Sequence, residues 1–290
     1  MISINIMGGL GNQLFMIFTT LAYGIQHNIK VVFPYHCQML RRHTYWDSFL
    51  KDLTIFTTEN RGNNMNDGQI FSLPIYYENG FHYTPIPQID NVLLYGYFQS
   101  PKYFDQVKDQ IFKILHLLDK QQNIKAKFSG LFDTTGELVS LHFRLGDYKE
   151  NRYHHAIMNY EYYENALTYV VDHSPAVSRV LYFCESEDNE YVSGQINRLQ
   201  NRFPGIEFFK VPDIAEDYEQ LLIMSCCHHN IIANSSFSWW GAYFNGFQEK
   251  IVCFPSAWFG EGYQNYNHVD MIPGDWIQIQ AKPKHHSEPL

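Results

Sequence analysis

The sequence predicts an α/β protein of two domains, each with parallel strands and packing helices. It opens with a strand, a glycine-rich turn, a helix and a second strand, which together form a βαβ unit. After Leu138, short apolar strands alternate with helical segments, as in a sheet wound by helices. The length of 290 residues also favours two domains with separate cores.

In the first half, the period of the apolar residues marks the elements. Ile2 to Met7 form a short apolar strand, and Val31 to Phe33 form the next one. Between them, apolar residues recur at helical spacing at Leu14, Ile17, Phe18, Leu21, Ala22 and Ile25. The segment from Tyr35 to about Asp90 is rich in Asn, Tyr and Pro, and its pattern leaves the topology open.

The second half has a regular pattern that predicts a Rossmann-like domain. The expected strands are Leu138 to Phe143, Val180 to Cys184, Ile206 to Val211, Asn230 to Asn234 and Lys250 to Phe254. The expected helices are Tyr160 to Asp172, Asp188 to Arg202, Asp217 to Cys226 and Phe237 to Asn245. We expect domains over residues 1–128 and 129–280, followed by a frayed tail over 281–290.

Composition and charge exclude several classes of protein. Hydrophobic residues at 45% and charged residues at 18% are typical of a folded globular protein. The net charge of −9 disfavours a nucleic-acid partner. Five cysteines, two of them adjacent, do not form a disulfide framework, and no apolar run reaches the roughly 18 residues of a membrane span. We therefore expect a cytoplasmic protein without a membrane segment.

The first candidate site is the turn between the opening strand and its helix. It contains Gly8, Gly9, Asn12 and Gln13. Backbone amides at a helix start hold phosphates, and glycine lets the backbone approach closely. The same turn can be purely structural. The GxGxxG spacing of dinucleotide-binding proteins is absent, which disfavours an NAD-dependent oxidoreductase.

The second candidate site is the sequence HFRLGDY, which begins where a strand is expected to end. Arg144 offers a fork of donors to a leaving diphosphate, and Asp147 either accepts a proton or orients the arginine. His142 lies beside them in the sequence. The alternative is a structural Arg–Asp ion pair at the end of the strand.

The third candidate site is the sequence IIANSSFSWWGA, which predicts a strand, a polar turn and a helix. Its polar residues are Asn234, Ser235, Ser236 and Ser238. One of them is enough to cap the helix, so the surplus favours a phosphate ligand. We interpret Trp239 and Trp240 as packing residues in preference to platforms for a sugar.

The absence of a metal clamp limits the chemistry. The sequence lacks an Asp-x-Asp pair and the HExxH, GxSxG and Walker A motifs. The run CCHH at 226–229 has metal-ligand types but not their spacing, and we interpret it as packing. We expect no metal, so arginines, amides and helix starts must neutralise a departing diphosphate.

Together, these motifs resemble the alpha-1,2-fucosyltransferase family, glycosyltransferase family 11. The resemblance rests on GGLGNQLF, HFRLGDY and IIANSSFSWWGA in this order, and extends to GYFQSPKYF at 96–104 and LIMS at 222–225. It spans roughly Ile2 to Trp276. It implies a GT-B fold, in which two Rossmann-like domains face each other across a cleft. It also implies metal-independent, inverting transfer of L-fucose from GDP-fucose to a galactose-containing glycan, at O2 of galactose.

The resemblance also implies roles for individual residues on the donor side. Arg144 contacts the β-phosphate, with His142 and Asp147 beside it, while Gly9 and Asn12 approach the diphosphate. Glu185 or Asp188 meets the ribose or the guanine. The other residues expected to bind the donor are Gly8, Gln13, Asn234, Ser235, Ser236 and Ser238.

On the acceptor side, the resemblance points to three residues near the middle of the chain. They are Tyr97, Gln99 and Tyr103. For the general base, our candidate is Asp147, because it is the carboxylate that lies inside a ligand-facing motif.

One position departs from the family pattern and leaves alternatives open. The family usually has two consecutive arginines in the middle motif, whereas Leu145 follows Arg144 here. The missing charge permits weaker donor binding, another nucleotide-sugar donor, or compensation by Lys149 or Arg152. The aromatic content of 17% also fits a non-catalytic carbohydrate-binding protein.

Overall fold

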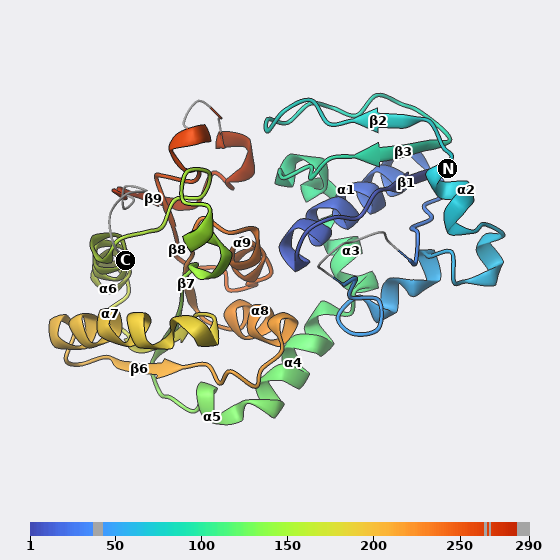
Figure 1. Cartoon of the computed structure of the whole chain (residues 1–290). Helices are drawn as coiled ribbons and strands as arrows, with labels where there is room; N and C mark the ends of the chain where they lie inside the picture. Colours follow the sequence, from blue (N-terminus) through green and yellow to red (C-terminus); the bar gives the residue numbers. More distant parts are fainter. Residues whose placement is uncertain (37–42, 264–265, 267, 283–290) are drawn as a thin grey trace. The chain divides into compact units, whose positions relative to one another are not determined.

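The computed structural model describes residues 1–36, 43–263, 266 and 268–282, which form two compact units (Figure 1). Unit 1 comprises Met1–Asp119 and Asn267–Pro273, and unit 2 comprises Lys120–Tyr266 and Gly274–Leu290. The expected boundary between 128 and 129 thus falls inside unit 2. The expected frayed tail lies largely outside the described residues.

Unit 1 is built on a parallel sheet of three strands in the order β1-β3-β2. The strands are β1 (Ile2–Ile4), β2 (Ile75–Tyr77) and β3 (Val92–Tyr95). The helix α1 (Leu10–His27) follows β1, which confirms the predicted strand, turn and helix. The expected strand at 31–33 makes only isolated bridges, from Val31 to Ile2 and from Phe33 to Thr57.

Unit 2 is built on a parallel sheet of six strands in the order β6-β5-β4-β7-β8-β9. Its strands are β4 (Glu137–His142), β5 (Val177–Phe183), β6 (Glu207–Lys210), β7 (His229–Ile231), β8 (Val252–Pro255) and β9 (Ile277–Ile279). The five predicted strands are confirmed. The sixth, β9, pairs with β8 and has no counterpart among the predicted strands.

Helices lie between β1 and β2 in unit 1 and between successive strands from β4 to β8 in unit 2, which confirms the α/β class with the two parallel sheets that a GT-B enzyme requires. The four predicted helices of unit 2 are present as α6 (Tyr160–His173), α7 (Asn189–Arg202), α8 (Asp217–Ser225) and α9 (Ser236–Tyr243). The others are α2 (Asp67–Phe71), α3 (Lys108–Ile114), α4 (Leu117–Lys127) and α5 (Ser129–Phe132). Within the described ranges, no helix combines the length and apolar character needed to cross a bilayer.

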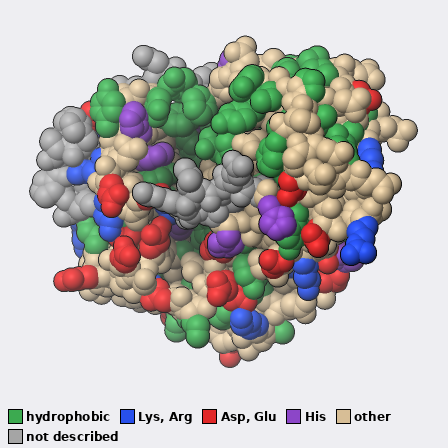
Figure 2. Space-filling model, turned by 45° about the vertical axis from the view of Figure 1, so that its right-hand side comes forward, with side chains coloured by type: hydrophobic (Ala, Val, Ile, Leu, Met, Phe, Trp, Pro, Cys, Tyr) green, Lys and Arg blue, Asp and Glu red, His purple; other side chains and the backbone are tan. Residues whose placement is uncertain are grey.

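Two tryptophans and two histidines that could bind a ligand have structural roles in unit 2. Trp239 and Trp240 are fully buried, which confirms their interpretation as packing residues. Nδ1 of His228 accepts a hydrogen bond from the backbone amide of Leu138, and Nδ1 of His229 accepts one from the backbone amide of Ile251. Figure 2 shows several groups of acidic side chains on the face that it draws, in keeping with the net charge of −9.

Candidate active site

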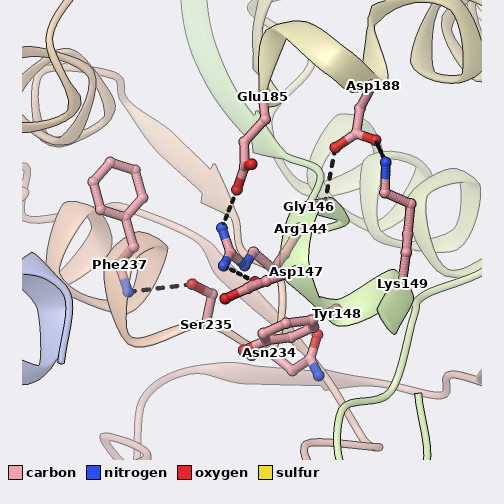
Figure 3. A network of polar contacts seen from close by, with 10 residues as sticks. All are labelled: Arg144, Gly146, Asp147, Tyr148, Lys149, Glu185, Asp188, Asn234, Ser235 and Phe237. Atoms are coloured by element: carbon pink, nitrogen blue, oxygen red, sulfur yellow. Dashed lines mark hydrogen bonds and ion pairs between the residues drawn. The ribbon is translucent and has the colours of Figure 1, made fainter. Parts of the chain in front are cut away.

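Polar residues gather where the parallel strands of unit 2 end. Arg144 follows β4, Glu185 follows β5 and Asn234 follows β7. Figure 3 shows these side chains around Arg144. Ligands of open parallel sheets bind beyond the carboxyl ends of the strands. The fold therefore brings the second and third motifs together on this edge.

Arg144 is held between two carboxylates. Its guanidinium donates to Asp147 and to Glu185, and its carbon lies 4.9 Å from the centre of the Tyr148 ring (Figure 3). The Arg144 side chain is 20% exposed, whereas those of Asp147 and Glu185 are 56% and 49% exposed. The Arg–Asp ion pair of the structural alternative is therefore present, and Glu185 is a second carboxylate partner of the same guanidinium.

The loop that carries Arg144 is anchored by a buried aspartate. Asp188 is 3% exposed and accepts hydrogen bonds from Gly146 N at 3.0 Å and from Lys149 Nζ at 2.6 Å. Gly146 has φ +38°, and a Cβ added there would collide with the carboxylate of Glu185. Asp188 thus holds the loop, and Glu185 is the more exposed of the two carboxylates predicted to meet the nucleoside.

Leu145, where the family has a second arginine, is part of the hydrophobic core. It is 4% exposed and packs in the cluster that includes Val139 and Leu141 of β4. Of the two cations named for the alternative of compensation, Lys149 is paired with Asp188. This edge therefore presents Arg144 without a second arginine at the adjacent position.

His142 ends β4 in a buried position beside the ring of Phe237, with centroids 5.7 Å apart. Burial, and to a smaller extent the neighbouring Arg144, lowers the pKa of His142 to about 3. Its Nδ1 is buried and has no hydrogen-bond partner. The imidazole is therefore neutral at neutral pH, and Arg144 is close enough to act on it electrostatically.

In the third motif, the side chain of Asn234 forms hydrogen bonds that join neighbouring loops. Asn234 Nδ2 donates to the carbonyls of Ala156 and Trp258, each at 2.9 Å, while its Oδ1 is buried without a partner. The hydroxyl of Tyr148 donates to the Asn234 carbonyl at 3.1 Å. The second and third motifs are therefore joined directly.

The serines of this motif surround the start of α9. Ser235 caps the helix by accepting from Phe237 N at 3.3 Å, and the Ser238 hydroxyl lies 3.5 Å from the Ser235 carbonyl. Ser235 and Ser238 are buried, and Ser236 is partly exposed. A helix start with amides and hydroxyls is a suitable place for an anionic group, beside the arginine of the neighbouring strand loop.

In unit 1, the predicted turn lies at the carboxyl edge of its own sheet. Gly9 caps α1, and a Cβ added to it would meet no atom within 4 Å, so the backbone there is open. The buried Gln13 donates to Gly8 O at 3.0 Å and to His43 O at 2.9 Å, which fixes the turn. Asn12 accepts from Gln99 Nε2 at 2.8 Å, so a predicted donor-side residue contacts a predicted acceptor-side residue.

The other acceptor-side residues lie around a carboxylate that the sequence alone does not reveal. Glu78, directly after β2, accepts a hydrogen bond from Tyr97 N at 2.7 Å. Tyr103 is buried, and its hydroxyl accepts from Thr84 N at 3.2 Å. The signal for Glu78 is weak in the sequence, because it lies in the segment without a clear pattern.

The sequence profile described as Glycosyl transferase family 11 matches residues 74–280. The chain belongs to this family. The matched range contains the second and third motifs together with Glu78 and the acceptor-side residues. The description of the matched profile names a family of glycosyltransferases.

Individual relatives are similar at a distance. The chain is 29% identical over 195 residues to the O-antigen biosynthesis glycosyltransferase WbnK of Escherichia coli, and 28% identical over 188 residues to an alpha-1,2-colitosyltransferase of the same organism. Each alignment covers 64% of this chain, but less than two thirds of those proteins, at 60% and 61%. A galactoside 2-alpha-L-fucosyltransferase of Caenorhabditis elegans is 25% identical over 87% of this chain and 71% of its own length.

Two solved structures of transferases have a distant likeness to this chain. The fucosyltransferase NodZ from Bradyrhizobium matches with a TM-score of 0.47 and 11% identity, over 83% of this chain and 92% of that chain. The FUT1 protein of Arabidopsis thaliana matches with a TM-score of 0.46 and 10% identity, over 87% of this chain and 69% of that chain.

Proposed function

We propose that this glycosyltransferase moves L-fucose from GDP-fucose to O2 of a galactose residue in a glycan acceptor, with inversion to an alpha linkage. The observation that carries the proposal is Arg144, which lies on the carboxyl edge of a parallel sheet beside the start of α9. The family membership and the similarity to a galactoside 2-alpha-L-fucosyltransferase support the choice of sugar and acceptor.

The proposed reaction is a direct displacement at the anomeric carbon of fucose. The acceptor oxygen forms a bond to that carbon and gives up its proton, while the bond to the β-phosphate oxygen breaks and its electron pair leaves with GDP. Arg144 exchanges its two carboxylate partners for the diphosphate and stabilises the charge that develops there. Glu185, released from Arg144, is then available to the hydroxyls of the nucleoside.

The proposed reaction needs no metal. Arg144 and the amides at the start of α9 supply the positive charge that a metal ion provides in other transferases. The hydroxyls of the third motif add neutral donors at the same helix start. Activity should therefore persist in EDTA.

A second donor is favoured by one specific observation. A relative of this chain carries the name alpha-1,2-colitosyltransferase, so activated colitose is an alternative sugar for the same site. A panel of nucleotide sugars, with GDP release measured in the presence of EDTA and a galactoside, distinguishes the two. Faster GDP release from GDP-fucose than from every other donor is the expected result, and release from another donor alone would reject the proposed sugar.

A further inference from the structure

The ring of Tyr148 contacts the Arg144 guanidinium in a different way from the two carboxylates. The guanidinium carbon lies over the Tyr148 ring, 4.9 Å from its centre (Figure 3). Asp147 and Glu185 instead accept hydrogen bonds from the N–H groups of Arg144. The face of an aromatic ring attracts a cation through its quadrupole and does not accept those hydrogen bonds in the plane of the guanidinium. The ring face therefore does not compete with an anionic ligand for the N–H donors.

Tyr148 is itself held by two neighbouring segments of unit 2. Its hydroxyl donates to the Asn234 carbonyl at 3.1 Å, and the His155 ring stacks on it with centroids 4.2 Å apart and ring planes 13° apart. Burial raises the pKa of the Tyr148 phenol, whereas Arg144 acts in the opposite direction through its charge and a hydrogen bond. The phenol therefore keeps its proton at neutral pH and remains a donor to Asn234. These contacts fix the ring as a surface for the guanidinium.

The contact between Arg144 and the ring can persist while the other partners of Arg144 change. In the proposed reaction, the diphosphate replaces Asp147 and Glu185, which are 56% and 49% exposed. An anion has no reason to displace a neutral aromatic ring from the face of the guanidinium. A donor stabilises a developing charge only if it is already held in the right place.

We propose that Tyr148 is a positioning residue, whose ring holds the Arg144 guanidinium in place while the diphosphate replaces the two carboxylates. This inference rests on the proposed function, in which Arg144 stabilises the leaving group. All the contacts that carry it lie within unit 2. Tyr148 acts on the reaction through Arg144 alone, so its effect must depend on the presence of that arginine.

The test measures kcat for GDP release by Tyr148→Leu, Arg144→Ala and the double variant, with the nucleotide sugar that the wild-type enzyme turns over fastest. Tyr148→Leu alone should lower kcat by about 5- to 30-fold, as expected for the loss of a partly buried cation–π contact. In the Arg144→Ala background, the same substitution should change kcat by less than about twofold, because the group that the ring positions is absent. A purely structural role of Tyr148 would lower kcat by the same factor in both backgrounds.

Two control variants complete the test. Tyr148→Phe keeps the ring and loses the hydroxyl, so it should turn over close to the wild-type rate. Phe209→Leu removes a ring over another arginine of unit 2, Arg179, whose guanidinium carbon lies 4.5 Å from the ring centre, and it should leave kcat unchanged. Circular dichroism shows whether each variant is folded. If Tyr148→Leu does not fold, Tyr148→Met takes its place, because methionine adapts to irregular space.

The outcomes separate this inference from the proposed function. An equal loss of kcat in both backgrounds, or a Tyr148→Phe variant as slow as Tyr148→Leu, would overturn the positioning role. A wild-type enzyme that transfers a sugar other than fucose would overturn the proposed donor and leave the comparison of the two backgrounds valid.

Discussion

At the scale of single residues, Arg144 has two carboxylate partners, which the diphosphate would replace in the proposed reaction. Asp147 and Glu185 are both about half exposed, so water screens their hold on the guanidinium. A diphosphate has two closely spaced anionic groups, which can accept hydrogen bonds from the same guanidinium donors. The exchange of partners is therefore a small rearrangement of side chains on a fixed loop.

Replacing Arg144 by alanine should lower kcat by about a hundred- to a thousandfold, because a preorganised donor to a developing anion contributes roughly 3 to 4 kcal/mol. Steady-state GDP release measures the change. Arg144→Lys, which keeps the charge but loses the fork, is the matched variant and should fall between wild type and alanine. Near-normal turnover by Arg144→Ala would contradict this role.

The buried His142 should make the protein less stable in acid. The unfolded chain takes up a proton near the ordinary pKa of 6.5, whereas the folded chain resists it until about pH 3. Stability from this residue is therefore lost as the pH falls through that window, by about 1.4 kcal/mol for each pH unit. In urea unfolding, the free energy of unfolding of His142→Asn should fall less steeply than that of the wild type between about pH 6 and pH 4. An equally steep fall in the free energy of unfolding of both proteins would contradict this role of His142.

At the scale of elements, the loop after β4 depends on a glycine. Gly146 has φ +38°, and a side chain there would be directed at the Glu185 carboxylate. Gly146→Ala should lower the free energy of unfolding by about 1 to 2 kcal/mol through backbone strain, and should reduce turnover by displacing Glu185. Chemical denaturation and GDP release measure the two effects.

The matched control is Gly194→Ala in α7, where an added Cβ meets no atom within 4 Å. Alanine is favoured in a helix by up to about 1 kcal/mol, so this variant should be as stable as wild type or more stable. An equal loss of stability in both variants would show that the strain at Gly146 is not the cause.

The elements that can be predicted from the sequence are those with a strong local pattern. β4 and β5 are apolar runs that are largely buried, and α1 has sustained helical spacing. By contrast, β2 has two exposed residues among its three, and β9 has one buried residue among its three, whereas the three residues of β1 and of β7 are all buried. Such short strands are defined by their partners in the sheet, which no local pattern encodes.

The residues of the candidate site also divide into those that a local sequence pattern predicts and those that it does not. Arg144 and the third motif are predictable because glycines, hydroxyls and an arginine stand where strands end. Glu78 is not predictable in this way, because its strand is short and its setting depends on Gly96, which is distant in sequence. The burial of Leu145 is also hidden, because its sequence position lies within a polar motif.

At the scale of the whole molecule, both units present polar residues on the carboxyl edge of a parallel sheet. Unit 2 offers Arg144 and the start of α9, which suit an activated sugar. Unit 1 offers Glu78, Asn12 and Gln99.

The most direct measurement is the structure of the product formed from GDP-fucose and a small galactoside, determined by NMR with EDTA present. We expect one new fucose in alpha linkage to O2 of galactose, formed in equal amount to the GDP released. GDP release without a fucosylated product, or a product with another linkage or anomeric configuration, would contradict the proposed function.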